Sequence, residues 1–418
     1  MRTTSPALFL LLPALAGTAG CKEYFSVDEA CHPDGDFRGK KVMGANEAAA
    51  TDRINCYRRL TQLERFGTTK EIYDASSGVA NYVLQNPELF RDFDVLDYAN
   101  QQTSKPGFTG TDVYERFDNA QYSPITTSGT KIHELFVMTG DLETSMVADI
   151  NESMTHHIVQ GHFLAPSAID FSISEVILDS NWWNTAYESG QWAERFGLTP
   201  ADIPTEGRFY YAVAVAEAQP FEHTNEPIAL PKRDQTDAAT HWGFNPAYYQ
   251  DPVTDELKEV ALGPSLFMAY VSPTSGAAAT GTATGAVTAA DNPYGMSVEN
   301  ASLHGPNGPI ETLIVNPGGE VEEGWLSFSR TGYLGAGIYP KEPLQPNTEY
   351  TFYYDMTTVD GPMSDSWSFK TGVGNDPGTS ASGTSARLAG PPASPAAAAA
   401  VPFLRGGQLV RSVVTAER

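Results

Sequence analysis

The spacing of hydrophobic residues predicts three helices in the first half of the chain. Residues 48–63, 71–85 and 141–157 each repeat apolar side chains at intervals of three and four, which places them on one face of a helix. Asp141 precedes the third repeat and is its expected N-cap, because its carboxylate can accept a backbone N–H of the first turn. These segments predict a layer of amphipathic helices.

Runs rich in β-branched and aromatic residues predict strands further along the chain. Residues 169–178 and 209–216 follow the helices, and residues 267–271, 349–356 and 366–370 lie in the second half. Helices that lead into strands indicate helices packed on a sheet, and the alternating strands of the second half are typical of a β-sandwich. The expected fold class is therefore α+β, with a mixed unit followed by an all-β unit.

The N-terminal pattern predicts export. Arg2 precedes an apolar run over residues 7–16, which is too short to span a bilayer and has the layout of a secretory signal peptide. The following Thr18-Ala-Gly-Cys21 resembles a bacterial lipobox, in which the cysteine is acylated and becomes the new N-terminus. An ordinary signal peptide cleaved near Lys22 is the alternative.

Acylation would make the chain an exported, membrane-anchored bacterial lipoprotein. We expect residues 1–20 to be the signal peptide and residues 21–45 to be an N-terminal arm lipidated at Cys21. Several acyl chains are enough for stable anchoring, since each buried CH₂ contributes ~0.8 kcal/mol. Lys22, rather than an aspartate, follows the lipid-bearing cysteine and favours the outer membrane or the cell surface.

The cysteine count supports an oxidising compartment. The chain has three cysteines, Cys21, Cys31 and Cys56. If Cys21 carries lipid, an even pair remains, so a Cys31–Cys56 disulfide is expected between the arm and the first helix. Two free thiols are the alternative. The sequence contains no CxxC motif, so neither a zinc ribbon nor a redox pair is indicated.

Charge and composition limit the classes of partner that the chain is expected to bind. The chain has 26 Lys+Arg and 51 Asp+Glu residues, which gives a formal net charge of −25 at pH 7. This charge repels nucleic-acid phosphates and anionic lipid headgroups, so no nucleic acid is expected as a partner and membrane contact would come from the lipid anchor. Residues 376–418 are rich in Gly, Ser, Ala and Pro and predict a disordered, low-complexity tail.

Four segments resemble the CAP superfamily, also called SCP-like, which is named for cysteine-rich secretory proteins, antigen 5 and pathogenesis-related 1 proteins. They follow the family's order and cover about 130 residues. The segments are Arg53-Ile-Asn-Cys-Tyr-Arg-Arg-Leu60, Ala80-Asn-Tyr-Val-Leu-Gln-Asn86, Pro106-Gly-Phe-Thr-Gly-Thr-Asp112 with Arg116 and Ala120-Gln-Tyr122, and Ser153-Met-Thr-His-His157 with residues 166–173. The resemblance implies a three-layer α-β-α sandwich over residues 46–217.

The resemblance also implies a cleft lined by two histidines and two acidic residues, which in some members binds a divalent metal. Glu134 matches the family's cleft glutamate. The family's first histidine has no counterpart, because the chain has no histidine between His32 and His133. The family's second acidic position falls at Ser153 or Met154 in this sequence, and Glu152 is adjacent but out of register. The family's last histidine could correspond to His156, His157 or His162, which lie within seven residues of one another.

The same residues have chemistry of their own. Imidazole and carboxylate groups together can bind a metal or exchange protons. His133-Glu134 begins like the HExxH motif, but Val137 takes the place of the second histidine, so the helical zinc-protease motif is absent. The candidate cleft residues are Glu134, His133, Glu152, Ser153, His156, His157 and His162. We assign neither a catalytic residue nor a metal ligand from the sequence, and no cofactor is expected, with zinc as the open alternative.

A second resemblance lies in the all-β half. The segment Ile338-Tyr-Pro-Lys-Glu-Pro-Leu-Gln-Pro-Asn-Thr-Glu-Tyr350 and the closing Trp367-Ser-Phe-Lys-Thr-Gly372 are similar to bacterial Ig-like modules. This implies an Ig-like β-sandwich over residues 272–375. Residues 218–271 are then expected to form a linking β-subdomain.

These observations predict a cell-envelope lipoprotein whose CAP-like domain is non-catalytic. Its expected role is to bind a small apolar ligand such as a lipid, a cell-wall polymer or a protein at the cell surface. One alternative is a hydrolase, with or without metal, that uses Glu134 with His156, His157 or His162. The other is a purely structural surface scaffold.

Overall fold

The computed structural model describes residues 24–31, 36–90, 96–123, 131–140, 145–166, 168–191, 199–216, 226–243, 247–254, 256–270, 296–317, 323, 325, 335–373 and 408–416. Helices and antiparallel sheets both contribute to these residues, so the expected α+β class is confirmed at that level. Within these ranges, no helix is both long and apolar enough to cross a bilayer.

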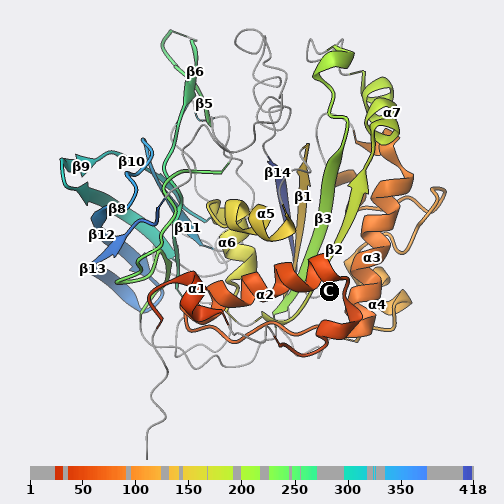
Figure 1. The fold of residues 1–418 in the computed structure, drawn as a ribbon, viewed down its shortest axis with the longest axis horizontal. Coiled ribbons are helices and arrows are strands. Elements are labelled where there is room, and N and C mark those ends of the chain that lie inside the picture. The colour runs from red at the N-terminus through yellow and green to blue at the C-terminus, as the bar shows by residue number, and fades with distance from the viewer. Residues whose placement is uncertain are drawn as a thin grey trace, which may run out of the picture.

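A four-stranded antiparallel sheet forms the centre of the first unit. Its strand order is β14-β1-β3-β2, and Figure 1 shows it between helices on its two sides. The strands are β1 (Lys131–Thr139), β2 (Ala168–Leu178), β3 (Gly207–Ala216) and β14 (Gln408–Ala416). The central position of β1 and β3 explains why their side chains are buried on both faces.

Helices cover both faces of this sheet. One face packs against α2 (Ala45–Leu60), α5 (Met146–Ser153) and α6 (His157–Phe163), and the other packs against α3 (Lys70–Gln85), α4 (Val113–Asn119) and α7 (Ser180–Gly190). Side chains that follow each other along a strand point to opposite faces. In β1, Leu135 therefore belongs to the first core and Phe136 to the second.

Two further four-stranded sheets form the second unit. One has the order β10-β11-β7-β4 and the other β13-β12-β8-β9, and their facing side chains share one apolar core. The strands are β4 (Ile228–Leu230), β7 (Leu266–Ala269), β8 (Met296–Gly305), β9 (Gly308–Ile310), β10 (Thr312–Val315), β11 (Ala336–Pro340), β12 (Glu349–Thr358) and β13 (Gly361–Lys370). A separate hairpin joins β5 (Ala247–Gln250) to β6 (Leu257–Val260).

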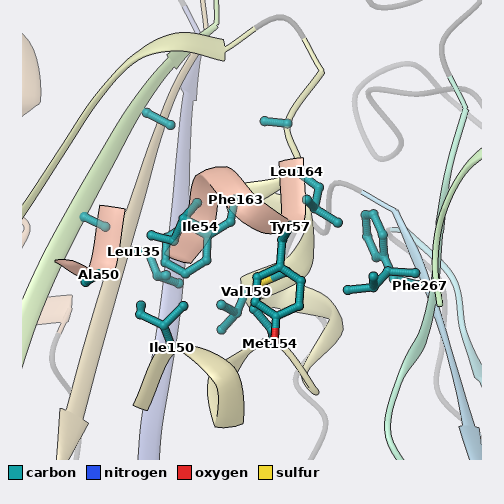
Figure 2. Packing of buried hydrophobic residues seen from close by; sticks show 14 of the residues in the cluster. Ala50, Ile54, Tyr57, Leu135, Ile150, Met154, Val159, Phe163, Leu164 and Phe267 are labelled. Carbon is teal, nitrogen blue, oxygen red and sulfur yellow. The ribbon is translucent and has the colours of Figure 1, made fainter. Parts of the chain in front are cut away.

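The two units are joined by a continuous hydrophobic core. Val159 and Phe163 of α6 belong to the same buried cluster as Leu135 on the central sheet and Phe267 on β7. Figure 2 shows this cluster, with Phe267 reaching it from the β side. Helix α6 therefore lies between the central sheet and the sheet that contains β7, and we call this region the seam.

The structure corrects the boundary expected at residue 271. Strands β4 and β7 precede that position, but they pair with each other, and β7 pairs with β11 beyond it. Residues 226–270 therefore contribute strands to the sandwich and do not form a separate linking subdomain. Short strands with distant partners leave no sign of their pairing in the sequence.

The expectation of a disordered tail is also wrong for the last segment. Residues 408–416 form β14 and pair along nine positions with β1. The sequence Gln-Leu-Val-Arg-Ser-Val-Val-Thr-Ala favours a strand because β-branched residues recur in it. The remainder of 376–418 lies outside the described residues.

The predicted helix over 141–157 is replaced by two shorter helices. Ser145 caps α5 by accepting a hydrogen bond from Ala148 N, and the chain turns at residues 154–156 before α6 begins. Residues 141–144, including the expected cap Asp141, lie outside the described part of the chain. The other two predicted helices correspond to α2 and α3, whereas α4, α7 and β1 were not predicted.

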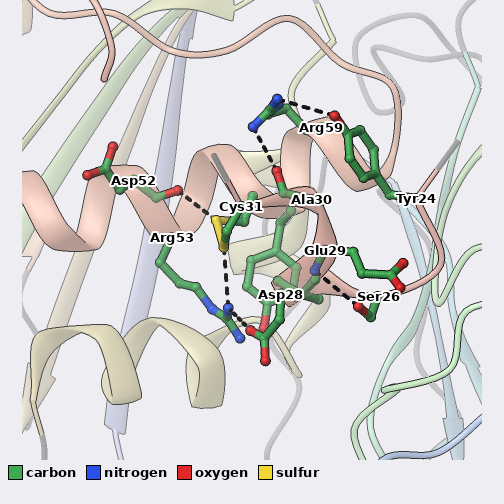
Figure 3. The surroundings of a disulfide bond; sticks show 12 residues. Tyr24, Ser26, Asp28, Glu29, Ala30, Cys31, Asp52, Arg53 and Arg59 are labelled. Atoms are coloured by element: carbon green, nitrogen blue, oxygen red, sulfur yellow. Dashed lines mark hydrogen bonds and ion pairs between the residues drawn. A yellow bond between two sulfur atoms is a disulfide. The ribbon is translucent and has the colours of Figure 1, made fainter. Parts of the chain in front are cut away.

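The predicted disulfide is present. Cys31 and Cys56 are bonded, with their Cα atoms 4.6 Å apart. Figure 3 shows the bond beside Arg53, whose guanidinium pairs with Asp28 of the short helix α1 (Val27–Ala30). The bond and the ion pair together attach the N-terminal arm to α2.

Arg58 of α2 forms the densest set of polar contacts in the seam. Its guanidinium is fully buried and lies 3.9 Å from the centre of the Phe66 ring. It donates hydrogen bonds to the carbonyl oxygens of Glu64 (2.6 Å), Phe163 (2.8 Å), Ala165 (3.0 Å) and Ala168 (2.7 Å). One side chain thus fixes the end of α6 and the start of β2 against α2.

We predict that Arg58→Ala lowers the free energy of unfolding by more than about 3 kcal/mol, since several buried carbonyls lose charged donors at once. Guanidinium-induced unfolding of the purified chain measures the loss. Arg59→Ala is the matched control, because the half-buried Arg59 donates only to Ala30 O and Tyr24 Oη among the described residues and should cost about 1 kcal/mol. Equal losses in the two variants would contradict the central role of Arg58.

Candidate functional site

The histidines expected in a cleft lie inside the seam. His156 is the N-cap of α6, and its Nδ1 accepts a hydrogen bond from Ile158 N at 3.1 Å. The His157 ring stacks on the His156 ring with centroids 4.9 Å apart, and its Nδ1 shares a hydrogen bond with the Tyr339 hydroxyl of β11. Both histidines are buried. They connect α6 to the β-sandwich and face its strands.

His162 lies on a different side of α6 from His157, the side that faces the central sheet. Its ring is fully buried, and its centroid is 6.4 Å from that of His133 on β1. Burial lowers the pKa values of His157 and His162 well below the usual 6.5, with smaller contributions from His156 and His133 respectively. Both imidazoles are therefore neutral in the folded protein near pH 7.

Glu134 lies on the opposite face of the sheet. Its carboxylate forms a buried ion pair with Arg116 of α4 and accepts a hydrogen bond from the Tyr211 hydroxyl at 2.8 Å. Arg116 also donates to Ala99 O at 2.7 Å. Burial raises the pKa of Glu134, and the opposing effect of Arg116 is smaller. This pair holds α4 against the sheet.

The structure does not bring Glu134 together with the three histidines of α6. His133 and Glu134 are neighbours in β1, so their side chains point to opposite faces. His133 shares a face with His162, while Glu134 faces the second core. A cleft that combines Glu134 with these histidines is therefore excluded by the alternation of a strand that the sequence analysis had not identified.

The remaining cleft candidates are also engaged within the fold. The Ser153 hydroxyl is buried and lies 2.9 Å from the Tyr210 hydroxyl of β3. The half-buried Glu152 packs against Gly243, where an added Cβ would meet its side chain. Among the described residues, no group of three or more His, Cys, Asp or Glu side chains is placed to hold a metal ion.

A pocket of about 220 Å³ lies at the seam and was missed by the sequence analysis. It is far larger than the ~10–15 Å³ that one water molecule needs. Its wall combines apolar and polar side chains from the arm, α2, α5, α6 and the β unit. The lining residues are Val27, Arg53, Tyr57, Asn151, Met154, Thr155, Gln160, Leu230, Pro231, Gln235, Asp237, Ala238, Ala239, Pro264 and Ser265.

Helices α2 and α5 supply one polar wall of this pocket. Asn151 Oδ1 accepts hydrogen bonds from Arg53 Nε at 2.6 Å and from the Tyr57 hydroxyl at 3.1 Å. Burial is the main cause that raises the pKa of Tyr57 to about 12, so the phenol stays protonated. These bonds fix the orientation of Arg53 at the pocket.

The β unit and α6 supply the other polar groups of the pocket. Asp237 accepts hydrogen bonds from Val27 N at 2.7 Å and Gln235 Nε2 at 3.0 Å. Ser265 and Gln160 are each only 1% exposed. Gln160 Nε2 donates to the backbone carbonyls of Met154 and Ser265. In contrast, Gln160 Oε1 and Ser265 Oγ have no hydrogen-bond partner among the described residues.

Comparisons with known proteins place no constraint on this site, because no family model, curated protein or solved structure matches the chain. The pocket could not have been located from the sequence. Arg53 and Tyr57 belong to a motif that the sequence analysis singled out, but Asp237 and Ser265 come from a stretch without a readable pattern. Cys21, the expected lipidation site, lies outside the described residues.

We predict that the free energy of unfolding falls as the pH drops below about 6.5, the usual histidine pKa. In that range the unfolded chain takes up protons at His157 and His162, whereas the folded chain keeps both rings neutral, so acid favours unfolding by about 1.4 kcal/mol per pH unit for each histidine. Urea unfolding between pH 8 and pH 5 measures this slope.

His162→Gln tests the assignment, since glutamine does not titrate. The slope should fall by the contribution of one histidine, while the control His304→Gln, at an exposed position, leaves it unchanged. Parallel pH curves for the parent and His162→Gln would show that His162 is not held neutral by burial.

Proposed function

We propose that this chain is an exported, lipid-anchored envelope protein that binds a small ligand without catalysis, in the pocket at the seam. The observation that carries the proposal is a preformed pocket whose walls hold buried polar atoms without partners among the described residues. Buried polar groups are nearly always hydrogen-bonded, so two such atoms on residues that line one pocket favour a ligand that supplies the missing bonds.

The layered architecture supports the family assignments as part of this proposal. Helices on both faces of an antiparallel sheet are compatible with a CAP-like sandwich, and two facing antiparallel sheets are compatible with an Ig-like module. On this view the sandwich does more than space the CAP-like unit from other surfaces. It contributes Asp237 and Ser265, and therefore half of the binding site.

The lining favours one of the three expected ligand classes. An apolar ligand would leave Arg53 and Asp237 without compensation for lost hydration. A polar group, such as a unit of a cell-wall polymer, can bond to them. The hydrolase alternative would need a different set of residues, because Glu134 lies on the far face of the central sheet.

We predict that the parent chain, residues 22–418, copurifies with a ligand that native mass spectrometry detects as an adduct heavier than a metal ion. Ala239→Trp should remove the adduct, because Ala239 is exposed at the pocket and an indole there fills it. Ala49→Trp is the matched control at an exposed position of α2 and should keep the adduct. Bare masses for all three proteins would favour a structural scaffold.

A separate prediction concerns the anchor. Cys21→Ser should move the protein from the membrane fraction to the soluble fraction of the exporting cells, since the acyl chains can no longer form. Immunoblotting of the two fractions measures the change. A variant that remains in the membrane fraction would contradict lipidation at Cys21.

A further inference from the structure

The pocket is lined by one residue of each charge, Asp237 from the β unit and Arg53 from α2. Asp237 of the β unit bonds only to neutral donors, Val27 N and Gln235 Nε2, and forms no ion pair with any described residue. It is half-buried, and burial is the main cause that raises its pKa, while the positive charge of Arg53 lowers that pKa by a smaller amount. A carboxylate in this setting is stabilised by a cation that enters the pocket.

Arg53 supplies the positive charge on the helical wall. Its Nε binds Asn151 and its Nη1 binds Asp28 at 2.6 Å, while Nη2 donates no hydrogen bond to the described residues. Asp28 is 84% exposed, so solvent screens its pairing with Arg53. The guanidinium keeps a donor for an incoming carboxylate, the group its planar geometry recognises best.

Two further residues that line the pocket each carry an uncharged polar atom without a partner among the described residues. Gln160 Oε1 accepts no hydrogen bond and Ser265 Oγ forms none within the described residues, although both side chains are almost completely buried. Gln160 cannot turn its amide without losing its two bonds to backbone carbonyls, so Oε1 remains an acceptor. Ser265 can donate or accept. The pair matches a ligand that presents an N–H beside a carbonyl oxygen.

We propose that the pocket binds a small zwitterion of the amino-acid or short-peptide class, with the ligand's ammonium group at Asp237 and its carboxylate at Arg53. Gln160 Oε1 accepts an N–H of the ligand, and Ser265 Oγ bonds to a carbonyl oxygen between the two charged ends. This inference rests on the proposed binding function and adds the chemistry of the ligand to it.

Titration calorimetry on residues 22–418 tests the assignment with a defined set of probes. L-lysine, L-alanyl-L-alanine and D-alanyl-D-alanine carry both charges. N-acetyl-L-alanyl-L-alanine lacks the ammonium group, L-alanyl-L-alaninamide lacks the carboxylate, and N-acetylglucosamine is polar and uncharged. We expect at least one zwitterion to bind, and each blocked form of a binding dipeptide to bind at least tenfold more weakly.

Variants assign each end of the ligand to its wall. Asp237→Asn should remove the discrimination between the dipeptide and its N-acetyl form, and Asp74→Asn, an exposed carboxylate of α3, should leave it intact. Ser265→Ala should weaken binding without lowering the melting temperature, because the hydroxyl has no partner in the fold to lose. Ser265→Ala therefore keeps the test valid if Asp237→Asn fails to fold.

The outcomes separate the two levels of the proposal. Binding of N-acetylglucosamine, abolished by Ala239→Trp, with no binding of any zwitterion would overturn the zwitterion and leave the binding function in place. Equal affinity for the dipeptide and its two blocked forms would also overturn it. If no probe binds and no adduct copurifies, both the zwitterion and the binding function are wrong.

Discussion

The buried guanidinium of Arg58 is the interaction on which the arrangement of the seam depends. Burying a charge is costly unless its donors form hydrogen bonds. Arg58 donates to four carbonyl oxygens, one of them just after α2 and the other three between the end of α6 and the start of β2. Buried carbonyls near the ends of helices and strands need hydrogen-bond donors, and Arg58 supplies donors to these. By bonding them, Arg58 determines where α6 lies relative to α2, and hence which residues of α6 face the β unit. The position of Gln160 at the pocket follows from this constraint.

The histidines of α6 then acquire structural roles that their chemistry alone does not suggest. His156 caps the helix, His157 bonds to Tyr339 across the seam, and His162 packs toward His133. A cluster of imidazoles in a sequence resembles a metal or proton-transfer site. Here the rings of His156 and His157 stack on each other beside the β-sandwich, whereas the His162 ring lies near His133 of the central sheet. His157 and His162 are both buried and neutral, which couples the stability of the seam to pH.

Sequence reasoning identified α2 and α3, which have a periodic exposed face, and missed β1, which has none. Helices α2 and α3 each bury one face, so their spacing was readable. Strand β1 is covered on both sides and contains His133 and Glu134, so it lacked both alternation and a purely apolar run. Because β1 was not predicted as a strand, Glu134 was wrongly expected in one cleft with the α6 histidines. Such a cleft requires all of these side chains to lie on the same face of the sheet. The disulfide was predictable because it depended only on the even number of cysteines left after Cys21 and on an oxidising compartment. The pocket depends on β4, β7 and the loops between them meeting α6, which no local pattern encodes.

A site at the seam differs in one energetic respect from a site within either unit. Side chains inside each core contribute mainly through packing. A polar atom without a hydrogen bond there lowers stability by roughly 1–3 kcal/mol, and no other interaction offsets that loss. At the seam, Gln160 Oε1 and Ser265 Oγ carry the same cost, but both residues line a pocket, and on the proposed function a ligand there forms the missing bonds. The charges of Arg53 and Asp237 face that space from different units, so a ligand that bonds to both walls would also hold the units together. Ligand affinity and the stability of the seam are then one linked quantity, since any molecule that binds only the folded arrangement raises its stability.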